Sequence, residues 1–216
     1  MLTRVTQGFA RREREALSDA LLAAGPDAPT LCEGWAAKDL AAHIVLRERR
    51  PLAAAGILVK PLARRTARIQ DRIAAGDYTE LVGKVRNPPA WSPVSNPVVH
   101  DKVNEVEMFV HHEDLRRAGS EWTPRELADA DSARLWSQIG RIAKLSLRKF
   151  PAVVVLSAPG HGEKRAGGRS EGDTLTVHGE PGELLLFLTG RQQVARVTVD
   201  GPEELAAKLR RARLGL

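Results

Sequence analysis

The chain has 216 residues, 43% of them hydrophobic, and a formal net charge of +6. This length is enough to bury a core of one domain, or of a larger and a smaller one, and no apolar run approaches the roughly 18 residues that cross a bilayer, which argues against a membrane protein. The first residues contain no apolar h-region and no small-residue cleavage site, so we do not expect a signal peptide, and a single cysteine excludes a disulfide scaffold; both features favour a cytoplasmic protein.

The positive charge is concentrated in one segment. Residues 47–86 contain ten Lys and Arg against four Asp and Glu, so the rest of the chain is neutral overall. The segment has one aromatic residue, Tyr78, and no helix-turn-helix, zinc-finger or RNA-binding signature. Its arginines could form a basic stripe for phosphate or an acidic partner, but a solvated helix face is the simpler interpretation. We therefore do not expect a nucleic-acid partner.

Apolar residues recur at helical spacing in four stretches of the first 150 residues. The first stretch ends at Gly25-Pro26, an ordinary helix stop. The last begins with Thr123 and Pro124, the pattern of an N-cap followed by a proline in the first turn. The four helices are predicted at residues 3–24, 35–50, 97–117 and 123–149. They indicate a mainly α fold, with an up-down four-helix bundle as the first domain, residues 1–150.

The remaining segments are predicted as a long excursion and a small second domain. Residues 51–95 form the excursion, with one short helix at residues 62–75. After Pro151 the pattern changes to alternating strands and helices, which predicts a small α/β C-terminal domain at residues 151–216 that packs on the bundle. Its glycine-rich stretch lacks the spacing of a nucleotide-binding loop and is predicted as a hairpin connection. The strands are predicted at 152–156, 174–178 and 195–199, and the helices at 181–188 and 202–214.

Three potential metal ligands lie in the second and third long helices. Glu107 and His111 are four residues apart, so their side chains share one helix face. His43 lies on or beside the apolar face of its helix, where a histidine is either a satisfied core residue or a ligand. Three nitrogen and oxygen ligands leave a coordination position open, as in catalytic rather than structural zinc sites. A Glu-x-x-x-His pair also occurs on ordinary solvated helices, so this alternative stays open.

The neighbours of these residues have competing interpretations. Asp114 could accept the second ring N–H of His111, or could be an exposed helix acid. His112 points about 100° away from His111 and is not expected to be a ligand. Cys32 lies shortly before the second helix and could approach the site, but it is predicted as a buried, inert thiol, and Trp35 is predicted as a packing residue.

Three patterns resemble a known family. They are Trp-x-x-x-Asp-x-x-x-His at residues 35–43, Glu-x-x-x-His-x-x-Asp-Leu at residues 107–115, and the tail at residues 179–191. In the same order along nearly the whole chain, they are similar to the mycothiol-dependent maleylpyruvate isomerase family of actinobacteria, whose N-terminal half is a DinB-like metal-binding bundle. The resemblance implies that a divalent metal, zinc first with nickel, iron or manganese as alternatives, is bound by His43, Glu107 and His111.

The resemblance also implies mycothiol or a similar thiol as co-substrate, and isomerase or thiol S-transferase chemistry on a small electrophilic substrate. A metal held by two imidazoles and one carboxylate keeps a positive charge and would lower the pKa of a bound thiol, whose thiolate then attacks the electrophile. The same position could ionise water, so a metal-dependent hydrolase and a non-catalytic metal-binding protein remain alternatives. The sequence does not distinguish a monomer from a homodimer.

Arg191 is the candidate catalytic residue outside the metal site. It follows the apolar helix of the C-terminal domain and could bind a substrate carboxylate if that domain closes over the mouth of the bundle. An arginine at a helix C-terminus also interacts favourably with the helix dipole, and this structural role is the alternative.

Overall fold

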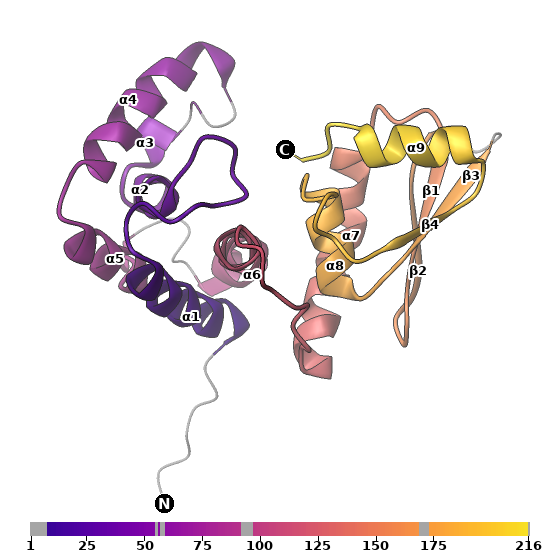
Figure 1. Ribbon diagram of the computed structural model, residues 1–216, viewed down its shortest axis with the longest axis horizontal. Helices are drawn as coiled ribbons and strands as arrows, with labels where there is room; N and C mark the ends of the chain where they lie inside the picture. Colours follow the sequence, from indigo (N-terminus) through magenta and orange to yellow (C-terminus); the bar gives the residue numbers. More distant parts are fainter. Residues whose placement is uncertain (1–7, 55, 57–58, 92–96, 169–172, 216) are drawn as a thin grey trace, which may run out of the picture. The chain divides into compact units, whose positions relative to one another are not determined.

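The computed structural model describes residues 8–54, 56, 59–91, 97–168 and 173–215, and it is mainly helical (Figure 1). The chain divides into two compact units, Met1–Trp122 and Thr123–Leu216. Among the described residues, no helix is both long and apolar enough to span a membrane.

The N-terminal unit is built from helices that enclose one apolar core. Helix α1 packs against α6 and α5, and α2 packs against α4 and α5. Buried residues at the centre of this core include Leu17, Leu40, Ile44, Val82 and Met108. The elements are α1 (Phe9–Ala24), α2 (Ala37–Arg49), α3 (Pro51–Ala54), the 3-10 helix η2 (Lys60–Leu62), α4 (Ala63–Ala74), α5 (Tyr78–Arg86) and α6 (Pro97–Arg116).

The segment between α2 and α6 is more regular than the sequence predicted. The predicted short helix is present as α4, but α5 is an additional helix that the prediction of an irregular excursion missed. Asp77 caps α5, because its side chain accepts a hydrogen bond of 2.7 Å from the backbone N–H of Glu80. The end of the predicted excursion, residues 92–96, lies outside the described residues.

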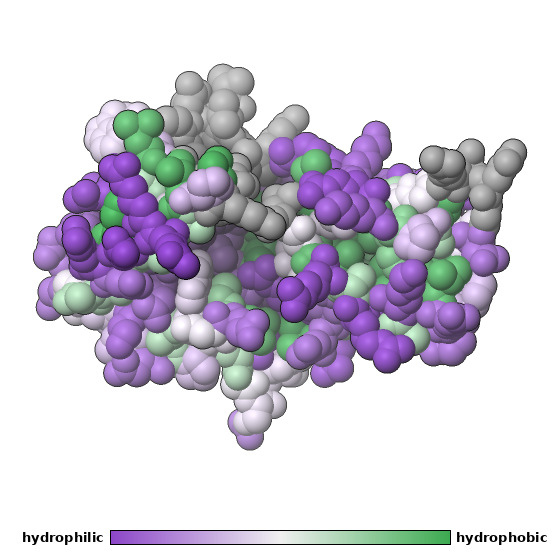
Figure 2. Space-filling model, turned by 90° about the horizontal axis from the view of Figure 1, so that it is seen from above, coloured by the Kyte–Doolittle hydropathy of each residue, from purple (hydrophilic) through white to green (hydrophobic). Residues whose placement is uncertain are grey.

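The basic side chains of α4 face solvent. Arg64, Arg65, Arg68 and Arg72 are all exposed, and α4 buries only Thr66 and Gln70. Figure 2 shows hydrophilic side chains over much of the surface in view. This exposure fits the interpretation of a solvated helix face.

The C-terminal unit combines one long helix with a four-stranded sheet. The strand order is β2-β1-β3-β4, with β1 and β3 parallel and the two outer pairs antiparallel. Helix α8 is buried along its whole length, and α7 packs against α8 and β2. The elements are α7 (Asp129–Ser146), β1 (Val153–Ala158), β2 (Gly162–Gly167), β3 (Thr174–His178), α8 (Pro181–Leu188), β4 (Thr198–Asp200) and α9 (Glu203–Arg211).

Three sequence predictions differ from the structure: the start of the fourth helix, the unit to which it belongs, and the glycine-rich stretch. Helix α7 begins at Asp129, with Ala128 as its N-cap, rather than at Thr123, and it belongs to the C-terminal unit. The reason is that its apolar face is covered by α8 and β2, so the division falls after Trp122 rather than after residue 150, and the predicted four-helix bundle of residues 1–150 is not confirmed. The glycine-rich stretch contains strand β2, which pairs with β1, rather than only a connection.

A buried ion pair joins three helices of the N-terminal unit. Arg14 on α1 donates from Nη1 to Glu48 Oε2 on α2 at 3.1 Å and to the carbonyl oxygen of Val85 on α5 at 2.7 Å, and its Nη2 also contacts Glu48. Both side chains are almost fully buried. Removing one partner would therefore leave a buried charge without compensation.

We predict that Glu48→Ala lowers the free energy of unfolding by about 3–5 kcal/mol, as is typical when one member of a buried ion pair is removed. Urea unfolding followed by circular dichroism measures this. The control is Glu15→Ala, which breaks the exposed Arg11–Glu15 pair on α1, the helix that carries Arg14. This variant should lower the free energy of unfolding by less than about 1 kcal/mol. The double variant Arg14→Met, Glu48→Leu should recover most of the loss, and equal effects of Glu48→Ala and Glu15→Ala would contradict the prediction.

Candidate metal centre

Helices α2 and α6 bring the three predicted ligands together. His43 Nε2 lies 3.2 Å from Glu107 Oε1, and His111 Nε2 lies 3.2 Å from the same oxygen. The three donor atoms all lie within 4.8 Å of one another. Both imidazoles are buried, whereas 23% of the Glu107 side chain is exposed to solvent. The cluster is therefore packed on the histidine side and accessible from solvent at the carboxylate.

The geometry of the cluster fits a divalent cation. Donors about 2.1 Å from a tetrahedral zinc ion are about 3.4 Å apart, close to the two separations of 3.2 Å observed between nitrogen and oxygen. Without a cation, each Nε2 needs a proton in order to donate to the shared carboxylate oxygen. His43 Nδ1 is buried and has no hydrogen-bond partner among the described residues, so Nε2 makes the polar contact of this ring. A cation at the centre could replace both protons.

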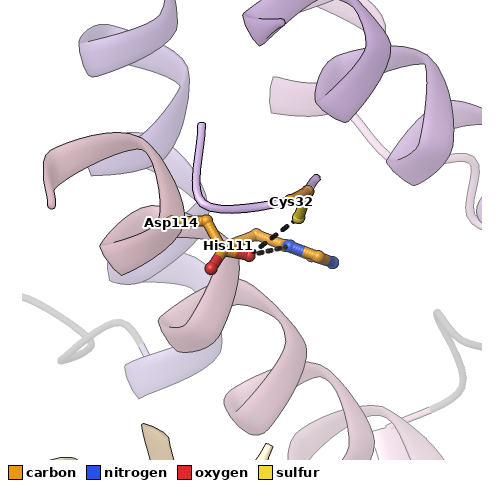
Figure 3. Close-up of side chains that lie close together, drawn as sticks. All are labelled: Cys32, His111 and Asp114. Carbon is orange, nitrogen blue, oxygen red and sulfur yellow. Dashed lines mark hydrogen bonds and ion pairs between the residues drawn. The ribbon is translucent and has the colours of Figure 1, made fainter. Parts of the chain in front are cut away.

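Asp114 orients His111 from the opposite side of the ring. His111 Nδ1 donates to Asp114 Oδ2 at 2.8 Å, and Cys32 Sγ donates to the same oxygen at 3.2 Å (Figure 3). Asp114 is fully buried, so the alternative of an exposed helix acid is wrong. The bond to Nδ1 fixes the ring so that Nε2 faces Glu107, the arrangement that metal-binding histidines use.

Cys32 differs from its prediction as a buried, inert thiol. It is only half-buried, and it forms a second cluster of possible ligands with His111 and Asp114. The loop that carries Cys32 is also held by a backbone bond of 3.0 Å from Leu31 N–H to the carbonyl oxygen of Asp114. Cys32 thus contacts the group that orients a candidate ligand.

Arg47 and Asn104 are site residues that the sequence analysis missed. Arg47 Nη1 lies 3.2 Å from Glu107 Oε2, the carboxylate oxygen that does not face the histidines. Its Nη2 donates to Asn104 Oδ1 at 2.5 Å. Arg47 was grouped with the basic segment, although it lies one helical turn after His43 on α2, and this spacing was the available signal.

The charges of the site shift the pKa values of two groups. Burial alone would raise the pKa of Glu107, but the positive charges of Arg47 and His111 outweigh it and hold this pKa well below its usual range. Burial alone would lower the pKa of His111, but Glu107 and the hydrogen bond to Asp114 raise it well above its usual value. Without a metal, a carboxylate therefore lies between two cations.

The other predicted residues lie outside this cluster. His112 Nδ1 pairs with Glu13 Oε2 on α1 at 3.0 Å, away from the three clustered donor atoms. The Trp35 ring packs on the His43 ring with centroids 5.1 Å apart. Arg191 follows α8 in the C-terminal unit, where its Nη1 donates to the carbonyl oxygen of Thr189. Its catalytic role stays a prediction.

Comparison with known proteins identifies the fold. No protein-family model matches the chain, and no curated protein matches it. A crystal structure of a histidine-to-alanine variant of the mycothiol-dependent maleylpyruvate isomerase is similar, with a TM-score of 0.59 and 17% identity over 89% of this chain and 90% of that one. A crystal structure of the mycothiol-dependent maleylpyruvate isomerase gives a TM-score of 0.55 and 18% identity over the same shares. These similarities confirm the mainly α fold that the sequence predicted, with a small four-stranded sheet in the C-terminal unit, but not the four-helix bundle.

We predict near-stoichiometric divalent metal in protein purified without an affinity tag, measured by mass spectrometry of the metal content. His43→Ala and His111→Ala should each lose it, because two remaining ligands hold a cation poorly. His112→Gln is the matched control, since this neighbouring buried histidine pairs with Glu13 instead, and it should retain the metal. A folded wild type that neither contains nor takes up metal, or loss of metal in the control as well, would contradict the assignment.

We also predict that metal binding releases protons and weakens as the pH falls. The raised pKa of His111 means that the metal-free site holds a proton at neutral pH that a cation must displace. Titration calorimetry in buffers of different ionisation enthalpy measures the number of protons released. In Asp114→Asn this number should fall, because only Glu107 of the two carboxylates that raise the pKa of His111 remains, and metal affinity should drop by about 10–100-fold. Metal binding at pH 7 without any proton release would contradict this prediction.

Proposed function

We propose that this protein is a divalent-metal-dependent enzyme of the thiol-dependent isomerase or thiol S-transferase type. The observation that carries the proposal is the convergence of His43, Glu107 and His111 on one point. It occurs in a chain with the fold of the mycothiol-dependent maleylpyruvate isomerase. We infer mycothiol or a similar small thiol as co-substrate and a small electrophile as substrate.

The proposed ligand set matches the needs of this chemistry. When bound, a divalent cation would lower the pKa of a thiol at an open coordination position, so that it reacts as a thiolate near neutral pH. Two neutral imidazoles and one carboxylate leave a cation with a net positive charge, which favours an anionic sulfur ligand. Zinc suits this set, and nickel, iron and manganese are alternatives.

The residues around the ligands have distinct supporting roles. Asp114 holds His111 in the tautomer that presents Nε2. Arg47 engages Glu107 Oε2, so Oε1 is the oxygen that faces the histidines. Because Arg47 also adds a positive charge beside the site, it would favour the binding of an anionic substrate.

Arg191 is the proposed binding residue for a carboxylate of the electrophilic substrate. Arg191 is a half-buried residue, and a guanidinium can form a bidentate contact with such a group. The positive charge would also stabilise negative charge that develops on the substrate when the sulfur adds.

The test replaces the native metal with cobalt and titrates mycothiol into the protein. Direct sulfur coordination should produce a thiolate-to-cobalt charge-transfer band that saturates with mycothiol and is missing in His43→Ala. In assays of thiol-dependent isomerisation, Arg191→Ala should raise KM for a carboxylate substrate at least about tenfold, as expected for a lost charge-assisted bond. Arg210→Ala, which removes an exposed arginine of the same unit, is the control.

Two outcomes would redirect the assignment. If no charge-transfer band appears at saturating thiol while cobalt is bound, the proposal of a thiol co-substrate is wrong. Turnover of esters or amides without thiol, abolished in His111→Ala, would instead support the metal-dependent hydrolase. Cobalt binding with neither result would leave a non-catalytic metal-binding protein.

A further inference from the structure

A second candidate binding site lies wholly within the C-terminal unit, separate from the metal cluster. It is a cavity of about 680 Å³ where the end of α7 approaches the end of α9 and the residues that follow it. This volume is typical of small-ligand sites. Four of the lining residues are cationic and one is a carboxylate: Lys149, Lys208, Arg211 and Arg213, against Glu204.

The cations of this cavity lack carboxylate partners among the described residues. Lys149, Lys208 and Arg213 form no ion pair there, and Arg211 only donates from Nε to the carbonyl oxygen of Ala207 on its own helix, at 3.2 Å. Lys208 and Arg211 lie in the last turn of α9, where the helix dipole favours cations. The other two, Lys149 and Arg213, come from different segments, so helix-end preference does not account for the whole group.

The cavity of the N-terminal unit provides a contrast. That cavity, of about 590 Å³, is lined by Arg49, Arg50, Arg72 and Lys84, but also by Asp77 and Glu80. One of its cations is already neutralised, because Lys84 Nζ lies 2.8 Å from Glu80 Oε1. The C-terminal cavity therefore carries the stronger uncompensated positive charge.

The C-terminal cavity also offers a hydroxyl and an apolar wall. Ser146 Oγ is buried and has no hydrogen-bond partner among the described residues. A buried hydroxyl without a partner is costly, so a ligand oxygen there would remove a penalty. Phe150, Pro151 and Leu214 line the same cavity and could contact the uncharged part of an organic molecule.

We propose that this cavity binds a small organic phosphate monoester. Such a group carries a charge near −2 at neutral pH and three acceptor oxygens, which matches several unpaired Lys and Arg side chains and the Ser146 hydroxyl. Lysine and arginine side chains are the usual partners of phosphate oxygens. The apolar wall distinguishes an organic phosphate from free inorganic phosphate, because only the former has a group to place against Phe150.

The test measures binding of phenyl phosphate to the full-length protein by titration calorimetry, with hydrogen exchange to locate the contact. Phenyl phosphate should bind and protect residues 146–151 and 204–214. The Lys208→Ala, Arg211→Ala double variant should bind at least about 20-fold more weakly, since each lost partly exposed charge contact costs about fivefold. Arg210→Ala is the matched control: this neighbouring arginine pairs with Glu203 at 3.2 Å and does not line the cavity.

Three further outcomes would contradict the proposal, and one would support it. Equal weakening in Arg210→Ala would show a diffuse attraction of the basic surface and would overturn the assignment. Equal affinity for inorganic phosphate and for phenyl phosphate would overturn the proposal of an organic ligand. Protection confined to the segments of His43, Glu107 and His111 would place the anion at the metal cluster instead. Weaker binding in Ser146→Ala, with Arg210→Ala unchanged, would support a built site.

Discussion

The structure of the N-terminal unit depends on the compensation of one largely buried carboxylate. Glu107 lies on α6, and three of the groups that contact it are cationic or can become so: His43 and Arg47 from α2, and His111 from α6 itself. A charge removed from water is tolerated only when it is paired and hydrogen-bonded. His43 and Arg47 of α2 therefore reach across to Glu107 on α6, whereas Leu40 and Ile44 of the same helix belong to the apolar core.

The same requirement extends along α6. Its buried residues include several ionisable groups, each with a partner: Asp114 contacts His111, Glu113 contacts Arg116 and Arg117, and His112 contacts Glu13 on α1. Because these side chains are buried, they pair with one another and with neighbouring helices in a polar network within the unit. The candidate metal cluster is a part of this network that remains open to solvent, through Glu107.

The sequence was most informative where periodicity and chemistry agreed. The spacing of Glu107 and His111, and the place of His43 in an apolar helix, were enough to bring the three side chains together in a prediction, and α2 and α6 have nearly the expected extents. Arg47 was missed because a positive charge in a basic segment resembles a solvated one, and only the tertiary contact distinguishes it. The fourth predicted helix was assigned to the wrong unit for a similar reason. Periodicity shows that Leu135 and Ile139 share a face, but not that α8 and β2 cover it.

Strand β2 and helix α5 show the limits of local patterns. The strand has the sequence GEKRAG, whose polar and glycine residues have low strand propensity, and it is stabilised by pairing with β1 rather than by its own residues. Helix α5 is nine residues long, too short to be stable alone, and depends on packing against α1 and α2.

The position of Asp114 also constrains how this protein can change in evolution. Its side chain holds both His111 and Cys32, while its carbonyl oxygen holds the backbone of Leu31. A substitution that removed the Asp114 carboxylate would alter the surroundings of His111 and would also break the contact with Cys32 in the loop before α2, whereas the backbone bond to Leu31 does not depend on this side chain. Drift in the loop sequence is restricted by the chemistry of the cluster, although the loop contributes none of the three converging donor atoms.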